Sequence, residues 1–205
     1  MVTVTDKKSE PAAPALARRD AVASLLADRG NLLVVSGLGS STYDVHASGD
    51  HDGNCYLWGA MGGAALIGLG LAQAQRDRPV LVITGDGEQL MAMGALATIA
   101  VARPRNLSIV VIDNQHFGET GMQASHTGLG IDLAKVASAC GFEATGTVDT
   151  LDAVSGLASM LHKPAPGPRL FVIRVAANNP PRSLPVRDAV FIKNRFRAHL
   201  GLAPN

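Results

Sequence analysis

The sequence has 205 residues, of which 47% are hydrophobic and 17% are charged, so it can bury the core of one domain and is not a mostly disordered chain. Its 18 Lys and Arg residues against 17 Asp and Glu residues give a net charge of +1, which excludes the basic excess typical of proteins that bind nucleic acid or anionic membranes. Two cysteines, Cys55 and Cys140, form neither a disulfide framework nor a metal-ligand spacing, which favours a reducing, cytoplasmic setting.

Residues 1–14 include charged side chains and no apolar run, so we interpret them as a flexible tail and not as a signal peptide. Residues 15–205 are expected to form a single domain. In chain order, its first half is predicted to contain a helix at 15–29, a strand at 32–36, a turn at 37–42, a helix at 42–47, a polar loop at 48–54, a strand at 56–58, a helix at 61–76 and a strand at 79–84. Its second half is predicted to contain a helix at 88–102, a strand at 107–113, a polar loop at 114–130, a helix at 132–140, a strand at 143–148, a helix at 150–162, a strand at 170–175 and a helix at 189–200.

Most of the predicted strands are unbroken apolar runs, and predicted helices alternate with them. This pattern is typical of an α/β protein with an open parallel sheet that helices cover on both faces. The loop at 114–130 is longer than a simple connection needs, and loops of this length usually act as lids or binding loops.

One segment without charges, 57–74, is long enough for a membrane-spanning helix, and its Gly59 and Gly63 form a G-x-x-x-G pattern. Its many glycines and its lack of aromatic and basic flanks argue against such a helix. We therefore expect a buried helix that packs against the sheet or against a partner subunit, and no membrane association.

Polar residues follow two of the apolar strands. Gly85-Asp86-Gly87 comes directly after the strand at 79–84, and Asp113-Asn114-Gln115-His116 ends the strand at 107–113. Ligands of an open parallel sheet bind outside the carboxyl ends of its strands. If these two strands are neighbours, Asp86 and Asn114 lie side by side at a binding site.

The residue types at these two positions suit a magnesium ion that holds a diphosphate. Asp86 offers a carboxylate oxygen, Asn114 an amide oxygen and His116 a backbone carbonyl, and Mg²⁺ prefers such oxygen ligands together with phosphates and water. The helix expected to begin at Glu88 offers free N–H groups to the same phosphates, and the glycines beside Asp86 let the backbone come close. The alternative is an ordinary turn, since Gly and Asp are common turn residues.

With this spacing, Gly85-Asp86-Gly87 and Asp113-Asn114 resemble the cofactor motif of thiamine diphosphate (ThDP)-dependent enzymes, a G-D-G followed by N-N, with Asp113 in place of the first Asn. The resemblance extends from about residue 16 to residue 200. It is closest to the diphosphate-binding half of sulfopyruvate and phosphonopyruvate decarboxylases, which have segments similar to 58–62, 96–100 and 120–123.

The resemblance implies roles for individual residues. Asp86, Asn114 and the carbonyl of His116 would hold Mg²⁺. In the segment around Ala60, the Gly59 carbonyl and the Met61 N–H would bind the aminopyrimidine of ThDP, and the Met61 side chain would wedge beneath the cofactor. The alternative for Met61 is plain core packing, for which methionine is a common gap filler.

In the family that this chain resembles, a glutamate from a separate pyrimidine-binding domain activates the cofactor. A chain of 205 residues leaves no room for a second domain of that size. The resemblance therefore implies a beta subunit of a split enzyme, a homodimer or hetero-oligomer in which a separate alpha subunit supplies the glutamate. The helix at 61–74 would lie partly at that interface.

Three side chains are candidates for a direct catalytic role. His116 could donate a proton after CO₂ leaves, or it could be a solvated loop histidine. Glu119 would disfavour a sulfonate or phosphonate substrate unless the charge of its carboxylate is paired. The alternative interpretation is that the Glu119 side chain only anchors the loop. His51 lies in a polar loop that could line the pocket.

The function expected from the resemblance is that of a ThDP- and magnesium-dependent carboxy-lyase subunit, which converts a small 2-oxoacid to an aldehyde and CO₂. One alternative is a carboligase similar to acetolactate synthase. Another is a non-catalytic module that binds a phosphate or a dinucleotide, or a regulatory subunit. A dinucleotide site needs G-x-G-x-x-G after the first strand, and the segment 37–42 lacks the third glycine.

Overall fold

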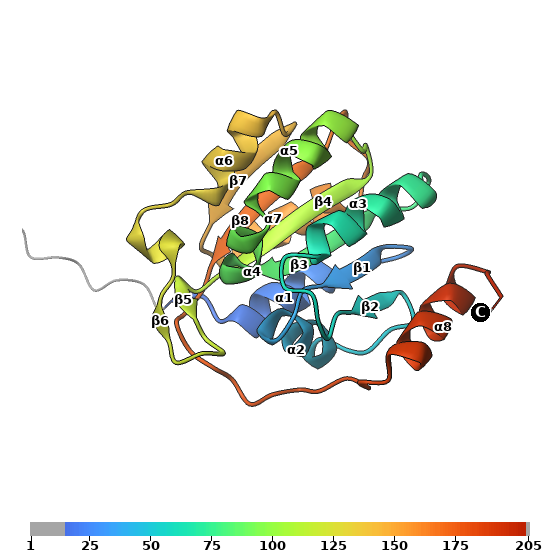
Figure 1. Ribbon diagram of the computed structural model, residues 1–205, viewed down its shortest axis with the longest axis horizontal. Helices are drawn as coiled ribbons and strands as arrows, with labels where there is room; N and C mark the ends of the chain where they lie inside the picture. Colours follow the sequence, from blue (N-terminus) through green and yellow to red (C-terminus); the bar gives the residue numbers. More distant parts are fainter. Residues whose placement is uncertain (1–14, 204–205) are drawn as a thin grey trace, which may run out of the picture.

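Within residues 15–203, the part of the chain that the computed structural model describes, six strands pair into one parallel sheet in the order β2-β1-β3-β4-β8-β7 (Figure 1). The tail predicted at 1–14 lies outside these described residues. The strands are β1 (Leu33–Ser36), β2 (Asn54–Tyr56), β3 (Val80–Gly85), β4 (Leu107–Asp113), β7 (Ala144–Val148) and β8 (Arg169–Arg174). The predicted parallel α/β sheet is confirmed.

Strand β3 lies between β1 and β4, and its last residue, Gly85, is paired with Ile112 of β4. Asp86 follows Gly85 directly, and Asn114 lies two residues after Ile112. Because neighbouring parallel strands end at the same edge of a sheet, the two side chains meet at its carboxyl edge, as predicted.

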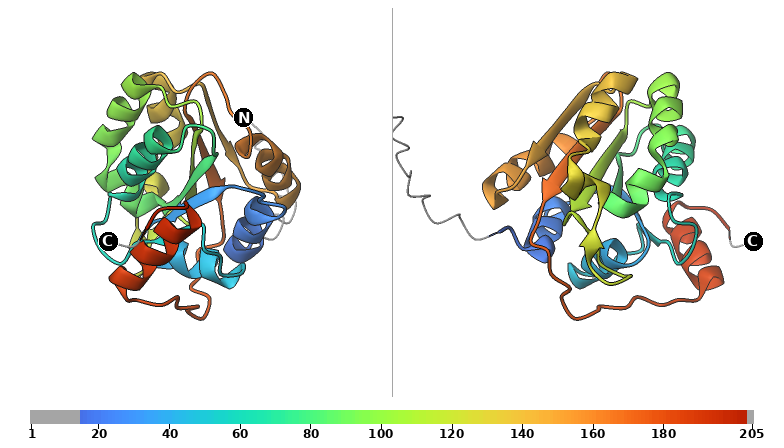
Figure 2. Two further views of the ribbon diagram at one scale, coloured as in Figure 1. Left: turned by 90° about the vertical axis from the view of Figure 1, so that its right-hand side faces the viewer. Right: turned by 60° about the vertical axis from the view of Figure 1, so that its left-hand side comes forward.

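Helices cover both faces of the sheet (Figure 2). Side chains alternate along each strand, so Val82 and Ile109 pack under one layer of helices, whereas Leu81 and Val110 pack under the other. Burying each such side chain stabilises the fold by about 1.5–3 kcal/mol. The first layer consists of α3 (Ala64–Ala74), α5 (Met93–Ala102) and α6 (Leu133–Cys140), and the second of α1 (Arg18–Leu26), α2 (Ser40–Ala47) and α7 (Leu151–Leu161).

The C-terminal helix α8 (Ala189–His199) packs beside the edge strand β2. Its Phe196 joins one hydrophobic cluster and its Ile192 joins the other. An uncovered edge strand would leave backbone groups free to pair with another chain, so this helix protects one end of the sheet.

The predicted helix at 88–102 is wrong in one respect, because the structure has two helices there. α4 (Asp86–Met91) begins directly after the strand, and α5 follows it after a break at Ala92, whose φ is −109° and ψ is 30°. The Nε2 of Gln89 donates to the Ala92 carbonyl at 3.3 Å, which satisfies an oxygen at the break. The apolar pattern of the sequence continues through Ala92, so this pattern does not indicate the break.

The loop predicted at 114–130 has structure of its own. It contains a short antiparallel hairpin of β5 (His116–Phe117) and β6 (Gln123–Ala124), and then the 3-10 helix η1 (His126–Leu129). The first helix is shorter than predicted and ends at Leu26, because Ala27 has an extended backbone with a ψ of 139°. The strand predicted at 56–58 corresponds to β2, which begins and ends two residues earlier.

The glycine-rich segment is helical only from Ala64, three residues after the predicted start. Its Gly68 lies directly against the sheet, since a Cβ added there would lie 2.2 Å from Val82 Cγ2. Among the described residues, no helix has both the length and the apolar character that crossing a membrane would require.

We expect opposite effects from alanine at two glycines of α3. Gly68→Ala forces a methyl group into Val82 and should lower the free energy of unfolding by about 1–3 kcal/mol. Gly70→Ala, which meets nothing within 4 Å, should raise it by about 0.5–1 kcal/mol because alanine favours the helix. Urea unfolding of the two variants measures both changes, and equal effects would contradict the close packing of α3 on β3.

Candidate active site

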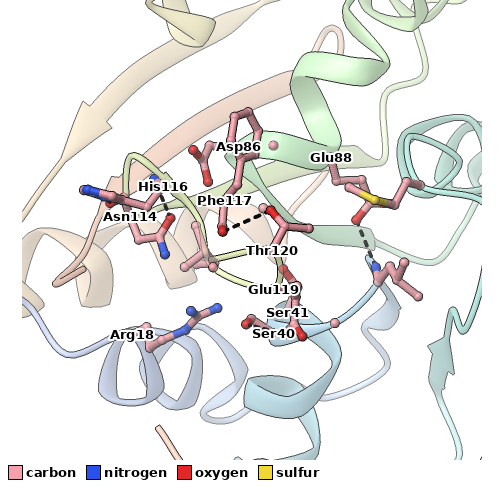
Figure 3. Close-up of a pocket in the computed structure, with 17 residues that line it drawn as sticks. Arg18, Ser40, Ser41, Asp86, Glu88, Asn114, His116, Phe117, Glu119 and Thr120 are labelled. Carbon is pink, nitrogen blue, oxygen red and sulfur yellow. Dashed lines mark hydrogen bonds between the residues drawn. The ribbon is translucent and has the colours of Figure 1, made fainter. Parts of the chain in front are cut away.

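A cavity of about 160 Å³ lies at the carboxyl edge of the sheet (Figure 3). The segments that follow β1, β3 and β4 line it, together with the start of α1. Gly85, Asp86, Gly87 and Glu88 contribute to one wall, and Met61 lies beside them. Most of the predicted site residues therefore surround one space, whereas Gly59, Ala60 and His51 do not line it.

Asp86 is a tightly held side chain of this cavity, and only 3% of it is exposed. The hydroxyl of Ser125 donates to its Oδ2, and Thr127 Oγ1 lies 3.2 Å from the same oxygen. Thr127 Oγ1 is also 2.8 Å from Asp113 Oδ1, so two buried carboxylates share one hydroxyl. Burial raises the pKa of Asp86, and the nearby Asp113 raises it further. Arg174 Nη1 lies 2.9 Å from Asp113 Oδ2 and offsets the charge of Asp113, whereas no ion pair within residues 15–203 offsets that of Asp86. A hard divalent cation fits the buried negative charge of Asp86.

Asn114 and His116 are held by a tight turn in which Gln115 has a left-handed φ of 63°. Asn114 Oδ1 accepts the His116 N–H at 3.0 Å, and His116 Nδ1 lies 2.8 Å from the Asn114 carbonyl. The His116 carbonyl accepts the N–H of Gly118 at 3.1 Å. Both oxygens keep a second lone pair, so each can still serve as a metal ligand.

The expected ligand set contains one carboxylate, one amide and one backbone carbonyl. Within residues 15–203, no group of three or more His, Cys, Asp and Glu side chains is arranged to hold a metal ion. The three oxygens of Asp86, Asn114 and the His116 carbonyl are of the kind that Mg²⁺ prefers, together with phosphates and water.

Glu88 lines the cavity, as the sequence predicts, but the helix does not begin there. The helix begins at Asp86, and the Glu88 side chain is 4% exposed. Its Oε2 accepts the Leu38 N–H at 2.9 Å, and its Oε1 accepts the Gly62 N–H at 3.3 Å. Burial raises the pKa of this carboxyl group. Glu88 thus connects the segment after β1 to the segment that contains Met61.

The segment 59–62 has a backbone shape that suits its predicted role. Ala60 has a left-handed φ of 58° and Gly62 a φ of 87°, so the chain turns sharply on either side of Met61. The Met61 side chain is 47% exposed and lines the cavity, whereas Gly59 has open space beside it. Met61 is therefore not a core gap filler in this chain.

Glu119 lines the cavity and is paired. Its Oε2 lies 2.9 Å from Arg182 Nη2, and its Oε1 accepts a hydrogen bond of 3.2 Å from Ser40. Arg182 comes from the segment between β8 and α8, which runs past the β5–β6 hairpin (Figure 1). Asn179 of the same segment donates to the Gly118 carbonyl at 3.3 Å, so this C-terminal segment anchors the hairpin.

The structure does not bring His51 to this cavity. His51 precedes β2, so it lies at the amino edge of the parallel sheet, opposite the site. Its Nδ1 accepts the Gly53 N–H at 2.9 Å, and its ring lies 5.3 Å from that of His199 in α8. Its contacts there are structural.

The residues that line the cavity but were not predicted as site residues include Arg18, Ser40 and Ser41. Ser40 and Ser41 belong to the Gly/Ser segment after β1, which the sequence suggests only as an incomplete dinucleotide motif. Ligands of a parallel sheet bind at the carboxyl ends of its strands, so the position of this segment after an apolar strand could have predicted its part in the site. Nothing in the local sequence marks Arg18, which reaches the cavity from α1.

Comparisons with known proteins find relatives of this chain. The model of the family described as "Thiamine pyrophosphate enzyme, C-terminal TPP binding domain" matches residues 39–175. The beta subunit of sulfopyruvate decarboxylase from Methanocaldococcus jannaschii is 41% identical over 120 residues, which cover 58% of this chain and 63% of that protein. A phosphonopyruvate decarboxylase from Streptomyces viridochromogenes is 42% identical over 122 residues, which cover 60% of this chain and 30% of that protein. This chain thus spans less than two thirds of the length of either relative.

A solved structure of similar fold is that of a thiamin diphosphate-dependent enzyme from Mycobacterium smegmatis. It has a TM-score of 0.65 and 20% sequence identity, and the match covers 84% of this chain and 34% of that one. The 4-hydroxybenzoylformate decarboxylase of Rhodococcus jostii has a TM-score of 0.63 and 21% identity, over 86% of this chain and 36% of that one. At this level of identity, the two structures show the fold alone.

Proposed function

Because this chain belongs to the family of thiamine pyrophosphate enzymes through their C-terminal TPP binding domain, we propose that it is the cofactor-binding subunit of a 2-oxoacid decarboxylase. Thiamine pyrophosphate and ThDP are the same compound. The reaction converts a small 2-oxoacid to an aldehyde and CO₂, as the names of the two decarboxylase relatives support. The observation that carries the proposal is the buried Asp86 beside Asn114 at the ends of two neighbouring strands.

In this proposal, Asp86, Asn114 and the His116 carbonyl hold Mg²⁺, and the ion binds the diphosphate of the cofactor. When bound, ThDP supplies the electron sink that decarboxylation of a 2-oxoacid needs. Met61 lines the cavity, and its side chain would support the cofactor from below. Glu88 keeps the Met61 segment in place through the Gly62 N–H.

His116 is the proposed proton donor for product release. Its Nδ1 lies within hydrogen-bonding distance of the Asn114 carbonyl, which can only accept, so Nδ1 carries a proton. The other ring nitrogen, Nε2, is then the one that exchanges a proton with the substrate.

The pairing of Glu119 bears on the choice of substrate. An unpaired carboxylate beside the pocket would repel an acidic group on the substrate, but Arg182 lies 2.9 Å from Glu119 and offsets its charge. Sulfopyruvate and phosphonopyruvate, the substrates named for the relatives, therefore stay among the first 2-oxoacids to try.

We also propose that a separate alpha subunit completes the site. The relatives from Methanocaldococcus jannaschii and from Methanothermobacter thermautotrophicus are named as beta subunits. Beside the cavity, the segment from Met61 to α4 exposes apolar side chains that a partner would cover, and such patches mark protein interfaces. The exposed fractions are 47% for Met61, 44% for Leu66, 41% for Ile67 and 66% for Met91. The partner would bring the activating glutamate to this face.

The first test is calorimetry of ThDP with this chain, and then with this chain mixed with the alpha subunit encoded nearest to it. We expect binding that requires Mg²⁺ and tightens with the partner. The complex is then assayed with a panel of 2-oxoacids for CO₂ and aldehyde. An acyloin product in place of the aldehyde would favour the carboligase, and no ThDP binding in the complex would contradict the proposal.

A further inference from the structure

Arg18 is a buried cation with unused hydrogen-bond donors. Only 4% of it is exposed, and it lines the cavity from the first turn of α1. Its Nε donates to Asp44 Oδ2 at 2.5 Å. In the described part of the chain, neither of its Nη groups makes a hydrogen bond, and in Figure 3 the guanidinium points toward the space between Asn114 and Ser41.

The charge around Arg18 is unbalanced. Asp44 is the carboxylate that pairs with it, and Asp44 is also 3.6 Å from the Nε of Arg19. Two guanidinium groups therefore share one buried carboxylate. Burial raises the pKa of Asp44, although Arg18 opposes this change. The Arg19 side chain is 32% exposed, so water screens its charge, whereas the buried Arg18 keeps Nη donors that an anion in the cavity could satisfy.

A second group of donors faces the same space. The helix α2 begins there with Ser40 and Ser41, and no side chain caps its first N–H groups. The residue before it, Gly39, has a left-handed φ of 71°. The first N–H groups of a helix favour an anion. Ser41 is close to the G-D-G segment, since a Cβ added at Gly85 would lie 3.8 Å from its Oγ.

The cavity therefore has two walls of opposite character. Asp86 and Asn114 offer oxygens to a cation on one wall. Arg18 and the start of α2 offer N–H donors to an anion on the other. A diphosphate bound to Mg²⁺ needs both, because the ion neutralises only part of its charge, and a guanidinium can bind two phosphate oxygens at once.

We propose that Arg18 binds the terminal phosphate of ThDP and is the residue by which this chain distinguishes ThDP from thiamine monophosphate. This inference rests on the proposed function, because it takes ThDP as the ligand of the cavity. A tetrahedral acid group of the substrate has the same chemistry as a terminal phosphate. The test below separates the two sources.

The experiment is calorimetry of the full chain with its alpha subunit, in the presence of Mg²⁺, with ThDP and with thiamine monophosphate as the two probes. Arg18→Met should weaken ThDP binding about 10- to 100-fold and leave the affinity for thiamine monophosphate unchanged. Arg18→Lys should retain part of the discrimination. The matched control is Arg19→Met, which also removes a partner of Asp44 but no side chain of the cavity, and it should change neither affinity.

Three results would overturn the inference. One is unchanged ThDP affinity in Arg18→Met. Another is equal weakening of both probes, which would mean that Arg18 acts on the fold. The third is unchanged ThDP affinity with a raised KM for the 2-oxoacid, which would assign Arg18 to the substrate. If Arg18→Met does not fold, the double variant Arg18→Met/Asp44→Asn removes the unpaired carboxylate and gives the same readout. Failure of the wild-type complex to bind ThDP would contradict the proposed function and this inference with it, whereas the three results above overturn the inference alone.

Discussion

Asp86→Asn is expected to abolish magnesium-dependent ThDP binding and to leave the fold intact. The substitution keeps the size of the side chain and one oxygen that can accept a hydrogen bond, but it removes the charge that would bind the ion. We expect the affinity for ThDP in the presence of Mg²⁺ to fall by at least about 100-fold, and decarboxylation with it. Calorimetry with and without Mg²⁺ measures the first effect.

The melting temperature of the same variant distinguishes the loss of a magnesium ligand from a loss of the fold. In the free chain, Asp86 is a buried carboxylate whose pKa is raised, first of all by its burial. Removing its charge should therefore leave the melting temperature of the free chain unchanged or slightly higher. Asp152→Asn, at an exposed position of α7, serves as the control and should change neither property. A large fall in melting temperature for Asp86→Asn would contradict the assignment of this carboxylate to a ligand.

The sequence predicts the sheet and its carboxyl edge well, because both follow from local patterns. Apolar runs between helices indicate a parallel sheet, and the polar residues after two of these runs mark the edge where Asp86 and Asn114 meet. The order of the six strands depends on contacts between distant segments, which no local pattern contains. The break at Ala92 was missed for the same reason, since the apolar pattern continues through it.

Three residues show the limits of prediction at the site itself. His51 was expected near the pocket, although a loop that precedes a parallel strand lies at the amino edge, and this rule could have excluded it. The contacts of Glu88 join residues 50 and 26 positions away, so its bridging role depends wholly on the fold. Arg18 sits on a helix with no local motif, and only the cavity reveals it.

Glu88→Ala is expected to disturb cofactor binding without touching the cofactor. The substitution leaves two N–H groups, those of Leu38 and Gly62, without their partner, and each loss costs about 1–3 kcal/mol. We expect the free energy of unfolding to fall by about 2–5 kcal/mol and the affinity for ThDP to fall at least about 10-fold. Urea unfolding and calorimetry measure the two effects. Glu143→Gln, in an exposed pair with Arg103 at 3.7 Å, is the control and should change stability by less than about 0.5 kcal/mol.

A double-mutant cycle separates the bridging role of Glu88 from a general loss of packing. A Cβ added at Gly37 would lie 2.0 Å from Glu88 Oε2, so Gly37→Ala alone must displace the carboxylate and weaken the same two contacts. In Gly37→Ala/Glu88→Ala this clash is absent, although the Cβ still lies 2.9 Å from Thr84 Oγ1. We therefore expect the double variant to lose clearly less stability than the two single losses added together, with a coupling of about 0.5–3 kcal/mol. Additive losses would mean that the two positions act independently, and the connection between the segments after β1 and around Met61 would then have to come from other contacts.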